Sequence, residues 1–328
     1  METLSPPRWG VLGTGGIAEK FVEDSQRLAD FHITAVGSRS QASAQRFAER
    51  FRLPLAFSSY EDLVHSPEVD VIYVATPHPW HYPHTMLALS AGKSVLVEKP
   101  FAMNAVQARA MVSLARSQKV FLMEAMWTRF LPHVQRVRKL LSEGLLGTLV
   151  TLQADHGQTF APDPKHRLFD PRLGGGALLD LGIYPVSFAS LLLGKPQKIT
   201  AVGDFTMTGV DAQTSMIFQY ASGAHAVLTT TLSASTSTRL SLTGTKARLE
   251  IATPFYAPSS FKVLSQGRTL EEYDEPYVGN GLREEAAEVI RCWSEGKTES
   301  PLMPLAETLE IMETLDAIRE QIGLSYPV

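Results

Sequence analysis

The chain has 328 residues, of which 44% are hydrophobic and 20% charged, and its formal net charge is −4 at pH 7. This length is enough for two domains, and the composition is that of a globular protein. The negative balance argues against nucleic acid as a partner. The lack of an uninterrupted apolar run of about 18 residues argues against a membrane-spanning segment.

The single cysteine, Cys292, excludes an internal disulfide and a cysteine-based zinc site. The N-terminal segment Met1–Arg8 lacks the basic and apolar regions of a secretory signal. We therefore expect a cytoplasmic protein.

Strand and helix patterns alternate along the first 125 residues. Apolar runs typical of buried strands occur at Trp9–Leu12, Ile33–Val36, Val69–Ala75, Ser94–Val97 and Val120–Met123. Helical patterns lie at Ile17–Leu28, Ala42–Phe51, Tyr60–His65, Pro83–Ala91 and Val106–Ser117. This alternation predicts a parallel sheet with helices on both faces, so residues 1–125 are expected to form an α/β domain.

The pattern changes after Gly147, beyond a helical stretch at Pro132–Ser142. Strand patterns follow at Leu149–Gly157, Lys198–Phe205, Ala212–Tyr220, Ala224–Leu232, Arg239–Gly244 and Ala247–Ile251. Helical patterns lie at Ala177–Leu193, Gly281–Glu295 and Leu305–Ile322, and Thr253–Gly279 is expected to be a loop region with one hairpin near Gln266-Gly267. We expect residues 126–328 to form an α+β domain with an open, mostly antiparallel sheet.

The first strand runs into a glycine-rich turn, Gly13-Thr14-Gly15-Gly16-Ile17-Ala18, which an amphipathic helix follows. The order Gly-x-Gly-x-x-Ala after a strand is the pattern of a dinucleotide-binding Rossmann turn. Its glycines allow a tight turn and a close approach of the backbone to a diphosphate, which the helix N-terminus attracts. The turn from Gly13 to Ile17 is therefore the predicted cofactor cradle.

The tip of the second strand, Gly37-Ser38-Arg39-Ser40, indicates which cofactor the cradle prefers. In this fold an acidic residue at the tip favours NAD, whereas an arginine accommodates the 2′-phosphate of NADP. Arg39 offers a planar set of donors, and Ser38 and Ser40 offer hydroxyls. We expect NADP, with NAD as the alternative if Arg39 is a solvated loop arginine.

The ends of later strands supply further candidate cofactor contacts. Thr76, Pro77, His78 and His81 follow the strand at Val69–Ala75 and are expected to lie along the cofactor. A metal site at these histidines is not expected, because no ligand-like acid accompanies them. Arg129 is a candidate for the cofactor phosphates or the substrate.

Trp127, which lies in the same junction segment as Arg129, is a further candidate cofactor contact. Packing between the two domains is the alternative role for the aromatic side chains Trp127 and Phe130.

Glu98, Lys99 and Pro100 end the fifth strand, on the side of the sheet where ligands bind. A lysine ammonium there would favour ionisation of a neighbouring hydroxyl or hold a substrate oxygen. The alternative is a surface lysine. Glu98 and Lys99 are both candidate cofactor contacts.

Asp180 and Tyr184 lie four residues apart in an apolar helix that follows three glycines, so they are expected to share a face. A buried carboxylate needs a partner. For Asp180 we expect the substrate or Lys99, with a backbone contact near the glycines as the alternative.

These motifs together resemble the glucose–fructose oxidoreductase/inositol dehydrogenase family, and the resemblance spans nearly the whole chain. It rests on Gly13-x-Gly15-x-x-Ala18, on Glu98-Lys99-Pro100 and on the glycine-run helix with Asp180. Tyr184 stands where much of the family has histidine, as in the branch that contains the dimeric dihydrodiol dehydrogenases and related xylose dehydrogenases. The resemblance implies NADP-linked oxidation of vicinal diols or pyranose sugars, and a C-terminal sheet that serves as a dimer face.

In the expected reaction, hydride passes between the nicotinamide and a ring carbon that bears a hydroxyl. Tyr184 is the candidate acid/base, and the charge of Lys99 would ease ionisation of the phenol, whose ordinary pKa is about 10. The opposite assignment, with Lys99 as the proton carrier, stays open. Asp180 would orient the pair or bind a second hydroxyl.

The expected substrate is a small polyhydroxylated ring, with a pyranose or cyclic polyol ranked ahead of an aromatic dihydrodiol because the aromatic residues are scattered. Phe160, His156, Arg167 and Phe169 are candidates to line its pocket, unless their segment is an exposed loop. The alternative function is a binding protein that senses NADP(H) without turnover. The polar face of the sheet is compatible with a homodimer or larger homo-oligomer and equally with a solvated surface.

Overall fold

The computed structural model describes residues 5–327; Met1–Leu4, part of the segment considered above as a secretory signal, and Val328 lie outside the described residues. The chain divides into two compact units. Unit 1 comprises Met1–Phe130 and Gly279–Leu309, and unit 2 comprises Leu131–Val278 and Glu310–Val328. The division differs from the expected boundary at residue 125 because a distant segment returns to unit 1.

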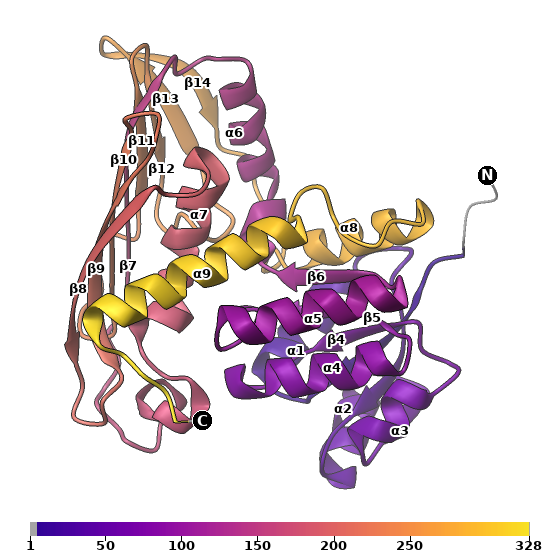
Figure 1. The fold of residues 1–328 in the computed structure, drawn as a ribbon. Helices are drawn as coiled ribbons and strands as arrows, with labels where there is room; N and C mark the ends of the chain where they lie inside the picture. Colours follow the sequence, from indigo (N-terminus) through magenta and orange to yellow (C-terminus); the bar gives the residue numbers. More distant parts are fainter. Residues whose placement is uncertain (1–4, 328) are drawn as a thin grey trace. The chain divides into compact units, whose positions relative to one another are not determined.

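Unit 1 is built on the expected parallel sheet, whose strand order is β3-β2-β1-β4-β5-β6 (Figure 1). The strands are β1 (Arg8–Leu12), β2 (His32–Gly37), β3 (Leu55–Phe57), β4 (Val71–Val74), β5 (Ser94–Glu98) and β6 (Leu122–Ala125). The helices are α1 (Gly16–Ser25), α2 (Gln41–Phe51), α3 (Tyr60–His65), α4 (His81–Ser90), α5 (Ala105–Gln118) and α8 (Arg283–Ser294). The sequence pattern missed β3, a half-buried edge strand of three residues.

The return of residues 279–309 to unit 1 is held by a buried carboxylate. Asp24 in α1 is 1% exposed and accepts hydrogen bonds from the backbone N–H groups of Gly281 and Leu282, both at 2.8 Å. These groups precede α8, whose N-terminus favours a negative charge. In addition, the N–H of Leu122 in β6 donates to the carbonyl of Thr298 at 3.1 Å.

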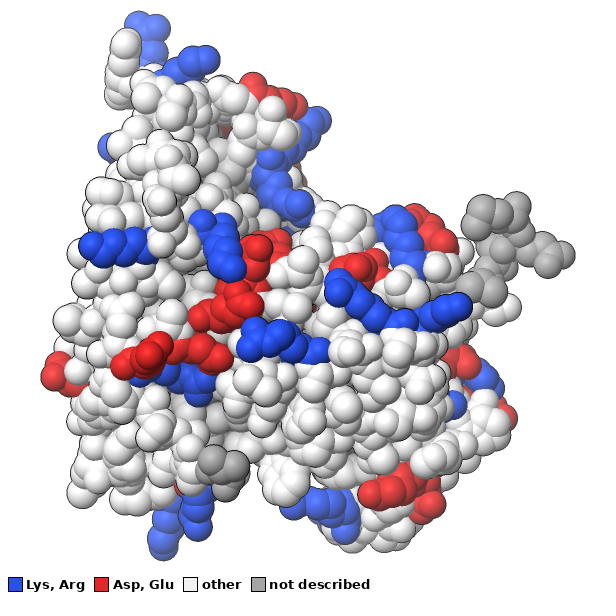
Figure 2. Space-filling model, in the orientation of Figure 1, with Lys and Arg blue, Asp and Glu red and all other residues white. Residues whose placement is uncertain are grey.

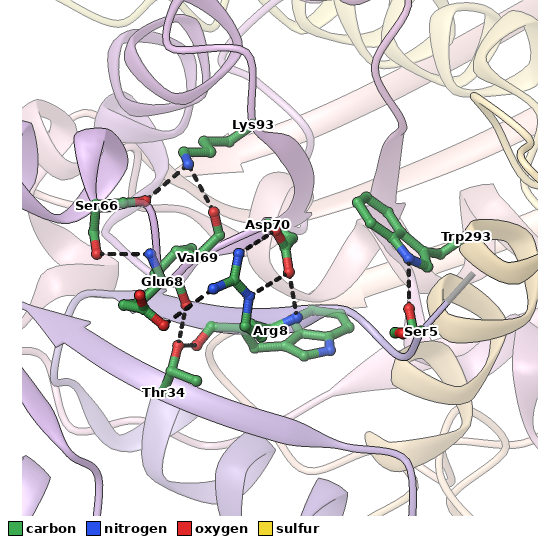
Figure 3. Close-up of polar contacts among 10 residues, drawn as sticks. Ser5, Arg8, Thr34, Ser66, Glu68, Val69, Asp70, Lys93 and Trp293 are labelled. Atoms are coloured by element: carbon green, nitrogen blue, oxygen red, sulfur yellow. Dashed lines mark hydrogen bonds and ion pairs between the residues drawn. The ribbon is translucent and has the colours of Figure 1, made fainter.

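At the amino edge of the unit 1 sheet, hydrogen bonds and ion pairs within the chain join neighbouring segments. Arg8 at the start of β1 binds both carboxylate oxygens of Asp70, each at 2.9 Å, and Lys93 donates to the carbonyls of Ser66 and Val69 (Figure 3). Here charged groups join the beginnings of strands. The carboxyl ends of the same strands, at the opposite edge, carry the predicted site residues.

Unit 2 contains an eight-stranded sheet with the order β14-β13-β12-β11-β7-β10-β9-β8. Its strands are β7 (Leu149–Gly157), β8 (Lys198–Phe205), β9 (Asp211–Gln219), β10 (His225–Thr231), β11 (Leu240–Gly244), β12 (Arg248–Ile251), β13 (Phe261–Ser265) and β14 (Arg268–Tyr273). The pairs are antiparallel except β7 with β10, so the expectation of a mostly antiparallel sheet is confirmed. The predicted hairpin at Gln266-Gly267 joins β13 to β14.

One face of this sheet packs on apolar helices, and the other face remains exposed. In β9 and β10 the buried Met216, Phe218 and Leu228 alternate with Ile217 and Val227, which are 46% and 42% exposed. Helix α7 (Ile183–Leu193) packs against β7 and β10, and α6 (Pro132–Ser142) and part of α9 (Leu305–Ile322) also belong to this unit. The alternation is that of a sheet covered on one side.

One helical stretch among the described residues, Pro171–Leu193, has the length and hydropathy of a membrane span, but 83% of its apolar window is buried within the structure. It is therefore a core helix. On the surface drawn in Figure 2, Lys and Arg side chains are interspersed with Asp and Glu.

Candidate active site

The glycine turn of unit 1 has the backbone that a diphosphate cradle needs. Gly13 has φ +113°, and a Cβ there would lie 2.8 Å from the carbonyl oxygen of Ala75. Any side chain at this position would collide with the backbone. At Gly15 and Gly16, by contrast, a Cβ would meet nothing within 4 Å, so the start of α1 faces open space. The unpaired N–H groups of the first turn are therefore accessible to an anion.

The tip of β2 places a cation beside this cradle. Arg39 is exposed and hydrogen-bonds the hydroxyl of Tyr60 at the start of α3. Tyr60 packs edge-on against His84 with ring centroids 4.6 Å apart, and His84 stacks on Trp80 at 5.7 Å. Sequence reasoning did not assign Tyr60 or Trp80 a role, and only the spatial arrangement reveals them beside Arg39. A guanidinium next to partly exposed rings suits an adenosine that carries a phosphate.

The two predicted serines at this tip already have local roles. Ser40 caps the N-terminus of α2, where its side chain accepts the N–H of Ser43 at 3.4 Å. Ser38 is 8% exposed, and its hydroxyl accepts the N–H of Ser40, also at 3.4 Å. Arg39 and Ser40 are both exposed, but the Ser40 hydroxyl is engaged as a helix cap, so Arg39 is the candidate of this trio for a phosphate contact.

His81 joins the two loops that follow β4 and β5. Its ring is 1% exposed, with Nε2 2.6 Å from the carbonyl of Thr76 and Nδ1 2.7 Å from the carbonyl of Pro100. Burial lowers the pKa of His81 to about 4. A neutral imidazole has one N–H, so it donates to one of the two carbonyls at a time. The side chain therefore links the two loops, and its predicted place along the cofactor stays a prediction.

Lys99 occupies the expected position at the carboxyl end of β5, and its side chain is partly exposed. Glu98 beside it is buried: it accepts a hydrogen bond from the hydroxyl of Tyr73, and its Oε2 accepts the backbone N–H of Lys99 at 3.2 Å. These two hydrogen bonds orient the Glu98 carboxylate and the backbone that carries Lys99.

The segment after β6 is buried within unit 1. Arg129 is 1% exposed and forms an ion pair with Glu307 at 2.8 Å, and Trp127 is 9% exposed. Nearby, Glu124 accepts the N–H of Phe101 at 3.0 Å, and burial raises the pKa of Glu124 to about 7. The guanidinium of Arg129 thus already has a carboxylate partner, in the segment that returns from residue 279.

Asp180 and Tyr184 of unit 2 lie in an irregular helix. Residues Leu178–Gly182 form a π-helical turn, and α7 begins at Ile183. The expected regular helix is therefore widened at Asp180, and such turns often occur at functional sites. Asp180 is 6% exposed, and both of its oxygens bind Arg167, at 3.1 and 3.2 Å. Arg167 is itself a predicted substrate residue, and the sequence pattern did not indicate that it pairs with Asp180.

Tyr184 lies in an aromatic group that the sequence pattern did not reveal. Its ring centroid is 4.7 Å from that of Tyr256 and 5.4 Å from that of His156, and Tyr256 stacks on His156 at 4.2 Å. Nδ1 of His156 is 3.2 Å from the carbonyl of Leu181, and Gln158 Nε2 lies 3.0 Å from His156 Nε2. A ring that donates through Nδ1 and accepts at Nε2 is neutral, which sets its tautomer.

The remaining pocket candidates divide between core and surface. Phe169 is 4% exposed and packs with Leu168 and Leu181, while Phe160 is half-buried at the edge of the same cluster. The guanidinium of Arg167 holds Asp180 from a side chain that is 53% exposed. Their segment is therefore partly anchored rather than a wholly exposed loop.

The arrangement agrees with comparisons against known proteins. Residues 7–126 match an oxidoreductase family with an NAD-binding Rossmann fold, and residues 134–250 match the GFO/IDH/MocA C-terminal domain. Curated relatives include the trans-1,2-dihydrobenzene-1,2-diol dehydrogenases of Mus musculus, 40% identical over 332 residues, and Homo sapiens, 37% identical over 332 residues. In both cases the similarity covers 98% of each chain.

Solved structures show the same fold over the full length. A 3-ketoreductase from Actinomadura kijaniata in complex with NADP and TDP-benzene is 26% identical, with a TM-score of 0.86 over 97% of this chain and 98% of that chain. An aldose–aldose oxidoreductase from Caulobacter crescentus complexed with glycerol is 25% identical, with a TM-score of 0.88 over 97% of each chain. The chain belongs to the GFO/IDH/MocA family of oxidoreductases.

Proposed function

We propose that the protein is an NADP-dependent dehydrogenase of cyclic vicinal diols, with pyranose sugars and arene dihydrodiols as the two substrate classes. The observation that carries the proposal is the glycine turn: the start of α1 is open, and the N–H of Gly13 donates at 3.0 Å to the carbonyl of Gly37, in the β2 tip that carries the exposed Arg39. The relatives named as dihydrodiol dehydrogenases support the diol, the aldose–aldose oxidoreductase supports a sugar ring, and the 3-ketoreductase in complex with NADP supports the cofactor.

The residues present fit the cofactor. The turn from Gly13 to Ile17 would hold the diphosphate, and Arg39 beside Tyr60 would hold the 2′-phosphate. When bound, NADP supplies the hydride acceptor at C4 of its nicotinamide.

In the proposed reaction the substrate carbon loses hydride and its hydroxyl loses a proton. Tyr184 accepts this proton as the general base and returns it in the reverse direction. The ammonium of Lys99 favours the ionised forms of the phenol and of the substrate oxygen. Asp180, which accepts hydrogen bonds from Nη1 and Nη2 of Arg167, binds a second substrate hydroxyl. Two adjacent hydroxyls on one ring would therefore each have a polar partner.

The aromatic group around Tyr184 bears on the substrate ring. Tyr256 stacks on the buried His156 with ring planes 24° apart and lies 4.7 Å from the ring of Tyr184, so a partly exposed aromatic ring adjoins the candidate base. This arrangement supports arene dihydrodiols more than the scattered aromatic positions in the sequence suggested. Pyranoses remain in the proposal because their C–H faces also pack on aromatic rings.

The function is tested by steady-state absorbance of NADPH at 340 nm with a panel of aldopyranoses, inositols and trans-dihydrodiols. We expect saturable turnover with at least one cyclic vicinal diol and none with matched monohydroxy rings such as cyclohexanol. NADPH that binds with no turnover on any panel member would instead support the cofactor-sensing alternative.

Cofactor choice is tested at Arg39. Arg39→Ala is expected to raise the Michaelis constant for NADP by roughly tenfold to a hundredfold and to leave that for NAD nearly unchanged, because a charge-assisted contact to the 2′-phosphate is lost. Initial rates with each cofactor measure the two constants. Arg116→Ala, which removes an exposed arginine of α5, is the control. Equal effects on NADP and NAD would contradict the assignment.

We also propose that the chain forms a homodimer or larger homo-oligomer through the open face of the unit 2 sheet. Val202, Ile217 and Val227 project from this face and are 67%, 46% and 42% exposed, and a cavity of about 540 Å³ lies on it among Thr229, Ser241 and neighbouring strand residues. Ile217→Glu is expected to shift the mass measured by sedimentation equilibrium towards the monomer. A wild-type protein that is already monomeric would contradict the proposal.

A cytoplasmic location is likewise proposed, on the basis of the single, buried and unpaired Cys292. Fractionation of cells that express the protein would show it, and recovery in a secreted fraction would contradict it.

A further inference from the structure

The C-terminal tail of unit 2 reaches back to the glycine turn that precedes Asp180 and Tyr184. Beyond α9, the hydroxyl of Tyr326 donates a hydrogen bond to the carbonyl oxygen of Gly175 at 2.7 Å. In Figure 1 the tail ends beside the short helical turns of this region. The contact joins residues that are 151 positions apart in the sequence, so it closes a long loop.

Tyr326 is held in place for this contact. The guanidinium of Arg319 in α9 lies over its ring, with the central carbon 5.5 Å from the ring centroid, and Arg319 also pairs with Asp316. Burial and the carboxylate of Asp211 raise the pKa of Tyr326. The phenol is therefore protonated over the working pH range of the protein, and its O–H is available as a donor.

The turn that receives this hydrogen bond is closely packed and depends on outside partners. A Cβ at Gly175 would lie 2.6 Å from the carbonyl oxygen of Leu168, and one at Gly176, where φ is +109°, would lie 2.1 Å from Asp211 Oδ1. Glycines have no side chains with which to fix themselves, and they lose more backbone freedom on folding than other residues. The N–H groups of Gly175 and Gly176 donate to the carbonyls of Asp170 and Leu168 at 3.1 and 2.8 Å, and side chains from distant segments add further hydrogen bonds to this backbone.

Asp211 is the second such partner. It is fully buried at the start of β9, and its Oδ2 accepts the N–H of Leu178, the first residue of the π-helical turn, at 2.8 Å. It also accepts the hydroxyl of Thr214 at 3.0 Å. Asp211 therefore holds the first N–H of the π-helical turn, and Tyr326 holds the carbonyl of Gly175, which precedes that turn by Gly176 and Ala177. The two contacts anchor the segment that leads into Asp180 at two separate points.

We propose that Tyr326 is a positioning residue, which through the carbonyl of Gly175 fixes the start of the helix that presents Asp180 and Tyr184 to the substrate. The proposal depends on the function proposed above. Small displacements of groups that act on a substrate lower turnover strongly even when the displaced groups are intact. Tyr326 would thus influence kcat through the backbone of the glycine turn rather than through a contact with the substrate.

The test compares Tyr326→Phe with Tyr220→Phe. The first variant keeps the ring over Arg319 and removes the hydroxyl. The second is a matched control in the same unit, because the buried hydroxyl of Tyr220 has no hydrogen-bond partner among the described residues. We expect Tyr326→Phe to lower kcat by about threefold to tenfold, the change that one neutral hydrogen bond supports. The KM of Tyr326→Phe for NADP and the kcat of the control variant are expected to stay at wild-type values.

A chain that stops after Ser325 removes the ring as well and is expected to lose at least about tenfold in kcat, since the contact with Arg319 is lost too. Hydrogen–deuterium exchange gives a readout that does not need activity. In Tyr326→Phe the amides of residues 175–184 should exchange faster, while those of β8 and β9 should match the wild type.

The outcomes separate the positioning role from the proposed function. Suppose that the wild type turns over a panel substrate and that Tyr326→Phe equals it in kcat or in amide exchange at residues 175–184. This result would overturn the role of Tyr326 and leave the proposed function intact. A lower melting temperature with unchanged kcat would reveal a merely structural tail and also overturn it. A wild type inactive on every panel substrate would overturn the proposed function and, with it, any role of Tyr326 in turnover.

Discussion

Replacing Lys99 with methionine is expected to lower kcat by roughly a hundredfold or more, because the variant loses the only charge that the proposed mechanism places beside the substrate oxygen. Methionine keeps the length of the side chain and its apolar stem. Backbone contacts such as that from the N–H of Lys99 to Glu98 Oε2 are therefore retained. Turnover of the best panel substrate measures the effect, and NADPH binding by titration calorimetry shows whether the cofactor site survives.

Lys297→Met is the matched control. Lys297 belongs to the same unit, is exposed, and forms an ion pair with Glu295 at the amino edge of the sheet. It should keep wild-type turnover. Nearly full activity of Lys99→Met would refute the role of the ammonium in this reaction.

Lys99→Arg separates the two possible roles of the lysine. Arginine keeps the positive charge but cannot release its proton in a protein. If Lys99 acts by charge, the arginine variant should retain more activity than the methionine variant. If Lys99 carries the proton, the two variants should be equally impaired.

Tyr184→Phe is the second large effect that we expect, again a loss of roughly a hundredfold or more in kcat. Phenylalanine preserves the ring that packs against Tyr256 and His156, at 4.7 and 5.4 Å, so the aromatic group stays filled. Only the hydroxyl that exchanges a proton with the substrate is removed. Single-turnover kinetics with saturating NADP would place the loss in the chemical step.

Tyr220→Phe controls for removal of a buried hydroxyl elsewhere in unit 2. If Tyr184→Phe kept near-wild-type turnover while Lys99→Met and Lys99→Arg were both inactive, the proton would be assigned to Lys99. The assignment of Tyr184 as the acid/base would then be wrong.

Local patterns predicted the elements well where the periodicity was strong. The bounds of α6, β7, β8 and α9 match the structure, and the glycine turn was identified with its strand and helix. These features depend on neighbours within a few residues: apolar spacing, turn residues and the φ values that glycine allows. The short strand β3 was missed because three half-buried residues carry no recognisable period.

The candidate site could be predicted only in part, because sequence patterns report neighbours within a few residues. Its charged and hydroxyl-bearing members stand at the ends of strands or in a marked helix, so their types and positions were informative. Tyr60 and Tyr256 carried no such signal, and their neighbours Arg39 and Tyr184 are distant in sequence. Nothing in the sequence indicated that His81 and Arg129 are buried. Their polar partners, the carbonyl of Pro100 and the carboxylate of Glu307, come from other segments of the chain.

The parallel α/β architecture of unit 1, the dinucleotide turn and the polar groups able to do chemistry could be predicted from the sequence, because each is encoded by short-range spacing. That residues 279–309 complete unit 1, and that β7 lies in the interior of the unit 2 sheet, became known from the three-dimensional structure. It alone revealed the π-helical turn at Asp180 and the contact of Tyr326 with the glycine turn. These features are fixed by contacts between segments far apart in the chain, and such contacts leave no periodic trace in either segment alone.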